Sequence, residues 1–247
     1  TSFQEDFIKS SFIEVVDFPT DDFTGVSSGA TPVTASGDVL GDNLRSFFAN
    51  VNYNYKGKYY LTATFRGDGS SRFVNEQWGF FPGVSAAWNI TEDIMKESSF
   101  LNLLKLRVGW GLTGNNVIED FIARQVFTAD NIAYQGTAGT VPDRLGNPDL
   151  KWETTTQINF GLDYGILNSR VSGSLDFYVK NTNNLLLDAP IPTPSGFITN
   201  IQNVGEVQNT GVDIGLTTIN VQRGGFNWTT NVTVGYLKNE VKTLVDG

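Results

Sequence analysis

Apolar and polar residues alternate along much of this chain, and a repeat of two residues predicts β-strands. The clearest segment is 104–113, where even-numbered residues are apolar and odd-numbered residues are polar or glycine. Several such segments have about the 9–11 residues that a tilted strand needs to cross a membrane, whereas globular strands average about 5–6. The alternation recurs over 47–55, 59–66, 83–90, 154–164, 171–180, 212–216 and 227–236.

The connections between these segments alternate between short and long. Short turns on one edge of a sheet and long loops on the other are typical of outer-membrane barrels, where the turns are periplasmic and the loops extracellular. Greek-key connections in a sandwich would mix the two lengths. The intermediate connection 91–100 starts with Thr91-Glu92-Asp93, which predicts a short helical turn. The short connections are 56–58, 165–169 and 222–225, and the long ones are 17–43, 67–79, 114–153 and 181–206.

Aromatic residues lie beside the short connections. Four tyrosines bracket the turn 56–58, and Tyr164 and Trp228 lie near the other two turns. Amphipathic rings prefer the interface between membrane and water, so their repetition next to turns predicts an aromatic girdle. For any single tyrosine, its ordinary preference for strands is a sufficient explanation. The four are Tyr53, Tyr55, Tyr59 and Tyr60.

These patterns predict an all-β chain that forms part of an antiparallel transmembrane β-barrel. We expect about eight to nine strands, the ninth being a partial strand within residues 1–16, with long extracellular loops and short periplasmic turns. The first residues contain neither an initiating Met nor a signal peptide. We therefore expect residues 1–247 to be a fragment of a single barrel domain that lacks a plug and an N-terminal extension.

Composition and charge exclude several functions. With 26 acidic and 17 basic residues, the chain has no basic stripe for nucleic acid. The absence of Cys and His from the sequence excludes disulfides, thiolate chemistry and a Ser-His-Asp triad within this chain. Enzymatic activity would depend on carboxylates that show no pairing signal, so we expect no enzyme, no catalytic residue and no cofactor. We interpret these carboxylates as solvated groups or loop caps; they are Glu92, Asp93, Asp120, Asp143 and Glu153.

Acidic residues are concentrated in the predicted loop 17–43. Their carboxylates are the oxygen ligands that Ca²⁺ prefers, but their spacing matches no calcium-binding loop. We therefore expect these side chains to be solvated and the chain to hold no metal. The residues concerned are Asp17, Asp21, Asp22, Asp38 and Asp42.

Five blocks of sequence carry a family pattern, and they follow one another in the family's order. Their local chemistry is structural: Asp68-Gly69-Ser70-Ser71 predicts a turn with an Asx-type cap, and Pro148 interrupts strand pairing. Over roughly residues 45–240 the chain resembles the barrel of SusC/RagA-type TonB-dependent transporters. The blocks are Asn52-Tyr53-Asn54-Tyr55-Lys56-Gly57-Lys58-Tyr59-Tyr60-Leu61-Thr62-Ala63-Thr64 with Arg66-Gly67-Asp68-Gly69-Ser70-Ser71-Arg72-Phe73, then 78–88, 104–115, 147–154 and 203–212.

The resemblance implies active import of a large nutrient, a glycan or a peptide, across the outer membrane of a Gram-negative bacterium. It also implies a SusD-like surface lipoprotein that lids the barrel, and energy from TonB–ExbB–ExbD through the plug. Two alternatives remain open. A passive porin would share the strand pattern but not the ordered blocks. A soluble carbohydrate-binding β-sandwich would gather its aromatic residues on one face or edge rather than at strand ends.

The long loops 114–153 and 181–206 are the predicted substrate and lid contacts. Loops of this length in a compact fold are commonly functional. Aromatic rings stack on sugars, and Arg and Asn donate hydrogen bonds, although packing of loop against loop would equally account for each residue. The candidate residues are Phe127, Tyr134, Arg144, Phe197 and Asn200.

Overall fold

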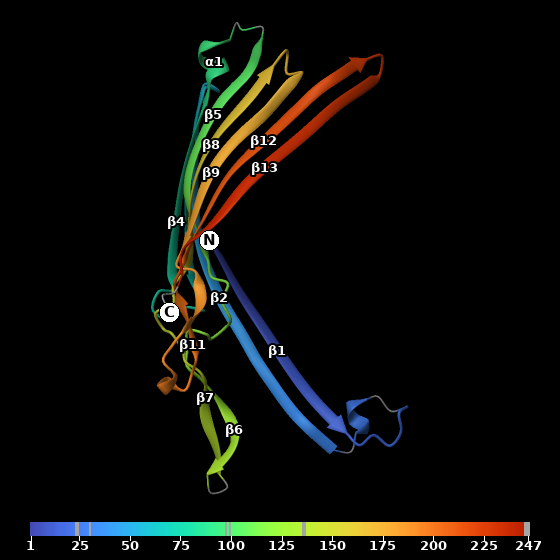
Figure 1. Ribbon diagram of the computed structural model, residues 1–247, viewed down its shortest axis with the longest axis vertical. Coiled ribbons are helices and arrows are strands. Elements are labelled where there is room, and N and C mark those ends of the chain that lie inside the picture. Colours follow the sequence, from blue (N-terminus) through green and yellow to red (C-terminus); the bar gives the residue numbers. More distant parts are fainter. Residues whose placement is uncertain (23–24, 30, 97, 99, 135–136, 245–247) are drawn as a thin grey trace.

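The computed structural model describes residues 1–22, 25–29, 31–96, 98, 100–134 and 137–244, and only the backbone at 32, 34–36, 38, 129–134, 137 and 138. Its main element is an open antiparallel sheet of nine strands in the order β1-β2-β3-β4-β5-β8-β9-β12-β13. The strands are β1 Ser2–Val16, β2 Thr31–Tyr55, β3 Tyr59–Ser70, β4 Trp78–Asn89, β5 Leu101–Asn115, β8 Glu153–Ile166, β9 Val171–Asn183, β12 Glu206–Arg223 and β13 Phe226–Thr243 (Figure 1).

The sheet confirms a partial barrel of eight to nine strands. Its two edges, β1 and β13, are not paired with each other, so the sheet does not close. In the described part of the chain, no helix is long and apolar enough to span a membrane. The short helices are α1 Ile90–Ile94, η1 Val26–Ser28 and η2 Thr193–Ser195.

The two ends of the sheet differ in their connections. The short-turn end carries the connections 56–58, 90–100, 167–170 and 224–225, and the long-loop end carries the rest (Figure 1). Lys56 and Gly57 have φ of 55° and 70°, and the Lys58 N–H donates to the Tyr55 carbonyl at 3.0 Å. Two left-handed residues form the hairpin turn whose twist matches that of the strands, and Gly adopts this conformation without strain.

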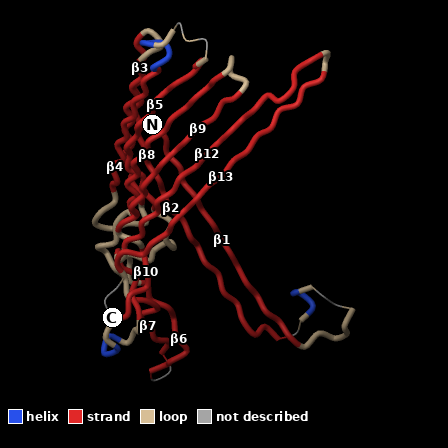
Figure 2. Tube along the Cα trace, turned by 45° about the horizontal axis from the view of Figure 1, so that its top comes forward, coloured by secondary structure: helices blue, strands red, loops and turns tan. Residues whose placement is uncertain are grey.

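The loop predicted over residues 17–43 is wrong in its second half. Residues 31–43 belong to β2, which pairs with β1 from Ser2↔Ser46 to Val16↔Thr31. This hairpin projects away from the other strands at the long-loop end (Figures 1 and 2). Side chains on both of its faces are exposed, so burial of one face imposes no clear alternation on its sequence.

The predicted loops 114–153 and 181–206 also contain strands. The first holds the hairpin β6 Val126–Tyr134 and β7 Thr137–Arg144, and the second holds β10 Leu186–Pro190 and β11 Thr199–Asn203. Both lie at the long-loop end (Figure 1). Where they meet the sheet, buried side chains form a rim core, with Leu186 and Ile201 packed against it. The rim core consists of Phe73, Phe81, Ala123, Leu150 and Trp152.

Strand register sorts the side chains onto two faces. Within the segment 104–113, exposed apolar residues alternate with partly buried polar residues or glycine over 106–111, as expected for a strand with one apolar face. Register then joins the apolar positions of eight strands into continuous rows. One row is Tyr53, Leu61, Ala86, Val108, Phe160, Phe177, Val212 and Tyr236, and the row beside it on the other face is Asn52, Thr62, Ser85, Gly109, Asn159, Tyr178, Gly211 and Leu237.

Candidate functional site

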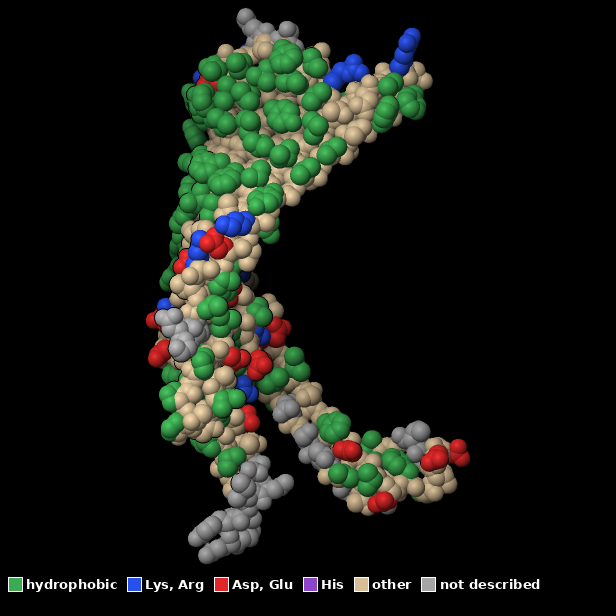
Figure 3. Space-filling view, in the orientation of Figure 1, with side chains coloured by type: hydrophobic (Ala, Val, Ile, Leu, Met, Phe, Trp, Pro, Cys, Tyr) green, Lys and Arg blue, Asp and Glu red, His purple; other side chains and the backbone are tan. Residues whose placement is uncertain are grey.

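The apolar face of the sheet exposes large side chains to its surroundings. Phe160 is 54% exposed and lies between Val108 and Phe177, which are 43% and 41% exposed. Figure 3 shows hydrophobic side chains covering the upper part of the sheet. A continuous exposed apolar surface on this scale marks a face that meets another apolar phase.

Aromatic rows bound this face at both ends. At the short-turn end, Tyr55 stacks on Tyr59 and Tyr59 on Trp88, with centroids 6.5 and 6.4 Å apart. A second cluster, which the sequence reading missed, lies eight residues away along β2 and β3, at Phe47 and its neighbours. Eight residues span about 26 Å of strand, close to the height of an outer-membrane apolar band. The second cluster consists of Phe47, Phe65, Trp78 and Phe80.

Two glycines allow this second cluster to form. A Cβ at Gly67 would lie 2.3 Å from the Phe47 ring, and one at Gly69 would lie 2.9 Å from the Trp78 ring. The rings therefore lie directly over the strand backbone. This explains why Gly67 and Gly69, which are successive positions on the apolar face of β3, are both glycine in the block Arg66-Gly67-Asp68-Gly69.

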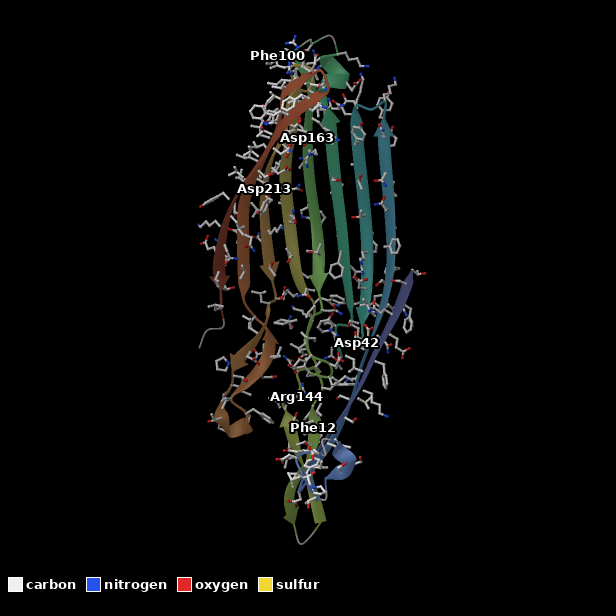
Figure 4. The ribbon with its side chains drawn as sticks, turned by 90° about the vertical axis from the view of Figure 1, so that its right-hand side faces the viewer. Phe12, Asp42, Phe100, Arg144, Asp163 and Asp213 are labelled. Atoms are coloured by element: carbon white, nitrogen blue, oxygen red, sulfur yellow. The ribbon has the colours of Figure 1, made fainter. Side chains whose placement is uncertain are left out.

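The opposite face is polar and contains an ion-pair cluster. Arg107 donates from Nε and Nη2 to Asp163 at 3.0 and 2.8 Å, and from Nη2 to Asp176 at 2.9 Å. Asp213 lies opposite Asp176 in the register, on the next strand beyond the two carboxylates that pair with Arg107 (Figure 4 labels Asp163 and Asp213). Gly161 leaves room for the cluster, since a Cβ there would lie 2.6 Å from the guanidinium carbon. Such charges require a wet surface, as in a barrel lumen.

A hollow of about 710 Å³ lies on the apolar face, and another of about 590 Å³ lies beside the rim core. The second is lined by Phe48, Asn50 and Trp152 among others, with the Arg66 guanidinium 2.7 Å from Asp68. Aromatic, amide and charged groups together suit a polar solute. The sequence did not single out this hollow, because its residues come from β2, β3, β4, β5 and the segment before β8.

The interpretation of Asp68 as an Asx-type turn cap is wrong. Asp68 lies within β3, is 6% exposed, and accepts both Arg66 hydrogen bonds. The turn begins after Ser70, whose hydroxyl accepts a hydrogen bond from Asn116 at 3.2 Å. Arg72, which follows β3, forms ion pairs with Asp42 of β2 at 2.9 Å and with Asp120 of the segment between β5 and β6 at 3.0 Å. The charged residues of this motif therefore hold the rim together.

The five predicted contact residues all lie at the long-loop end but not in one site. Phe127 on β6 is 58% exposed, and Arg144 at the end of β7 forms an ion pair with Glu119 at 3.5 Å (Figure 4). Phe197 and Asn200 are partly buried in the β10–β11 hairpin. Tyr134 ends β6, and its side chain lies outside the described part of the structure.

Three carboxylates that were expected to be solvated groups or loop caps form specific contacts instead. Asp120 contacts Arg72, and Asp42, from the acidic segment, forms an ion pair with the same guanidinium. Within the described ranges, no three acidic side chains are grouped to hold a metal ion. Asp93 in α1 accepts hydrogen bonds from Lys58 Nζ at 2.8 Å, from the Tyr59 hydroxyl and from Trp88 Nε1 at 3.1 Å.

This Asp93 clamp ties two neighbouring turns together. Hydrogen bonds from Lys58 and Tyr59 lower the pKa of the Asp93 carboxyl to about 2. A carboxyl whose pKa is lower in the folded state stabilises that state above its unfolded pKa, and this contribution is lost as the pH falls through the folded pKa. The clamp therefore acts throughout the physiological pH range.

We expect the stability advantage of the full-length wild-type protein over Asp93→Asn to be constant above pH ~4 and to shrink towards pH ~2. Urea unfolding followed by tryptophan fluorescence at several pH values measures it. Glu92→Gln, which removes a 52% exposed charge one residue away, is the matched control. An equal pH dependence in both variants would contradict the clamp.

Fold and surfaces together define a segment of β-barrel wall, with an exposed apolar face, a polar face and a loop-covered rim. Residues 5–246 match the family model described as TonB dependent receptor-like, beta-barrel. The chain belongs to this family of TonB-dependent receptor β-barrels.

Relatives confirm the resemblance to the SusC/RagA group. The chain is 40% identical to TonB-dependent receptor P39 of Formosa agariphila over 215 residues, 86% of this chain and 21% of that protein. It is 35% identical to TonB-dependent receptor SusC of Bacteroides thetaiotaomicron over 83% of this chain and 21% of that protein. The RagAB peptide importer in its closed-closed state superposes with a TM-score of 0.88 at 32% identity, over 99% of this chain and 28% of that chain. The chain thus spans about a fifth of the curated relatives' length.

Proposed function

We propose that this chain forms part of the barrel wall of an outer-membrane transporter that actively imports a large nutrient, a peptide or an oligosaccharide. The observation that carries the proposal is the two-faced sheet, in which apolar rows cross eight strands on one side and polar rows cross them on the other. Membership of the TonB-dependent receptor family supports import rather than passive diffusion. RagAB, described as a peptide importer, supports a peptide as one substrate class.

In this proposal the sheet crosses the outer membrane of a Gram-negative bacterium. The short-turn end lies in the periplasm and the long-loop end outside the cell, which is the arrangement of such barrels. The apolar face contacts lipid, and the cluster around Arg107 lines the lumen. A passive porin would share this geometry, but its transport would not depend on TonB.

The proposed partners act at the two ends. A SusD-like lipoprotein would cover the long-loop end and close the barrel over the substrate. The TonB–ExbB–ExbD complex would supply energy through the plug domain. Uptake of the cognate nutrient by cells expressing the full-length protein should therefore stop when TonB is removed, and persistent uptake would favour a porin.

Deletion of the β10–β11 hairpin tests most directly whether the long loops act in transport. Asn184 and Gly205 flank it with φ of 58° and 92°, and Asn183 pairs with Glu206. Deleting residues 185–204 would join Asn184 to Gly205, and Asn-Gly with both residues left-handed is a preferred two-residue hairpin turn. We expect the deleted full-length protein to insert normally and to lose nutrient uptake or copurification of the lipoprotein. Unchanged growth and copurification would exclude both roles.

A shorter deletion distinguishes direct contact of the hairpin tip with the substrate or the lid from structural support of the rim core. Replacing residues 191–198 with Asn-Gly keeps the Pro190↔Thr199 pair and retains Leu186 and Ile201 against the rim core, but it removes Phe197. If uptake falls in this variant too, the hairpin tip contacts the substrate or the lid. If it falls only in the longer deletion, the hairpin acts by supporting the rim core.

A further inference from the structure

The apolar face is hollowed where it approaches the short-turn end. The hollow has a volume of about 710 Å³ and is lined mainly by Tyr53, Leu61, Trp88, Leu106, Val108 and Phe160. These residues occupy the apolar rows of five neighbouring strands, β2, β3, β4, β5 and β8. Most of the residues that line this shallow trough are apolar or aromatic. Such a surface suits a hydrocarbon chain, which itself needs no hydrogen bonds.

Basic residues gather at the tight turns beyond this trough. The connections 56–58 and 167–170 and the β12–β13 turn region 223–225 carry four basic residues and no acidic one, although the whole chain has a net charge of −9. The wider connection 90–100 carries three acidic residues and Lys96. In Figure 3, Lys and Arg side chains lie at the upper right tips of the sheet, whereas acidic side chains gather in its lower part. The four are Lys56, Lys58, Arg170 and Arg223.

Three of these four cations face the surroundings. Lys58 is held by Asp93, but Lys56, Arg170 and Arg223 are exposed and form no ion pair among the described residues. Lys56 Nζ lies 5.2 Å from the centroid of the Tyr55 ring. This contact places the ammonium beside the stacked rings of Tyr55, Tyr59 and Trp88, at the level where a membrane's polar headgroups meet its acyl chains.

We propose that the short-turn end is a binding surface for an anionic glycerophospholipid. One acyl chain lies in the trough, the phosphate lies at Lys56, and Arg170 and Arg223 bind the headgroups of neighbouring lipids. Charge complementarity determines the choice of an anionic lipid, because each basic residue near an anionic surface strengthens membrane binding. The inference rests on the proposed function, which places the apolar face in lipid.

The test compares lipids that differ only in headgroup charge. The full-length protein is reconstituted in nanodiscs with equal amounts of phosphatidylglycerol and phosphatidylcholine that have the same acyl chains, then released for native mass spectrometry. Wild-type protein should retain phosphatidylglycerol preferentially. The triple variant Lys56→Asn, Arg170→Gln, Arg223→Gln should lose that preference, by on the order of fivefold for each charge removed. Asn is chosen at position 56 because it tolerates the left-handed φ of 55°.

The matched control removes three positive charges at the long-loop end, through Lys151→Gln, Lys238→Gln and Lys242→Gln, and should keep the preference. An equal loss in both triple variants, or retained preference in the first, would overturn the inference. If the first variant does not fold, the same measurement is made on wild-type protein at high salt. About 1 M salt shortens the Debye length to ~3 Å and should abolish the preference for phosphatidylglycerol. A preference that survives this salt would also overturn it.

Failure of the two proposals can be told apart. If the full-length protein inserts into vesicles of neither lipid, the barrel-wall function fails. If it inserts into both and retains them equally, only the lipid inference fails.

Discussion

Replacing Phe160 with Arg is expected to destabilise the full-length protein by ~2–4 kcal/mol, because the charge would be desolvated at mid-height of a lipid-facing surface. Phe160 is 54% exposed at the centre of an apolar row, between Val108 and Phe177. In water such an exposed position would accept Arg at almost no cost. Urea titration of the protein folded into vesicles, followed by heat-modifiable migration, measures the difference.

Asn159→Arg is the matched control. Asn159 neighbours Phe160 in the chain but faces the polar side, opposite Gly109 and Tyr178. The same charge there would remain in the wet lumen, so we expect a change within about 0.5 kcal/mol. If Asn159→Arg were the more damaging substitution, the two faces would be assigned the wrong way round. Equal tolerance of both variants would exclude a membrane location for this strand.

Phe73→Ala should cost about 3–5 kcal/mol of local stability at the rim, since it empties a fully buried aromatic site. Phe73 is 0% exposed and lies 5.4 Å from the Trp152 ring, centroid to centroid. The strands are held by their own ladders, so the loss should be confined to the loops that share the rim core. Hydrogen exchange should show lower protection around Ala123 and Leu150 and unchanged protection in β5 and β8.

Phe12→Ala controls for the loss of an aromatic ring as such. Phe12 is on β1 and 58% exposed, and it is not among the residues of the rim core or those packed against it (Figure 4 labels Phe12). Its removal should leave loop protection unchanged. Because the rim hollow shares Trp152 and Phe81 with this core, Phe73→Ala should also reduce nutrient uptake while leaving membrane insertion intact. Loss of protection throughout the sheet would show that the rim core stabilises the whole wall.

The strands of the main sheet follow from sequence wherever one face is apolar and the other polar. Segment 104–113 and its counterparts lie in strands, and the turn 56–58 ends β2 at Tyr55 and begins β3 at Tyr59. The helical start at Thr91-Glu92-Asp93 lies within α1, which Asn89 caps by accepting a hydrogen bond from the Glu92 N–H. These features depend on neighbouring residues, and a repeat of two shows directly which residues share one face of a strand.

The contacts between strands depend on their register, which cannot be deduced from local periodicity. The residues around Arg107 are 56 and 69 positions apart from it, at Asp163 and Asp176, and they meet only because β5, β8 and β9 pair as they do. The Asp93 clamp and the second aromatic cluster likewise join residues of different elements. A single sequence shows each as an isolated charge or ring.

Where neither face of a strand is buried, sequence pattern fails altogether. Residues 31–43 of the β1–β2 hairpin were predicted as a loop, and residues 1–16 only as a partial strand, because exposed faces place no constraint on which positions are apolar. The sequence by itself therefore determined the class of fold, the strands that have one apolar and one polar face, and the end of the sheet at which the long loops lie. Tertiary structure alone decided which loop residues form the rim core and which charges pair, because those contacts depend on backbone hydrogen bonding between distant segments.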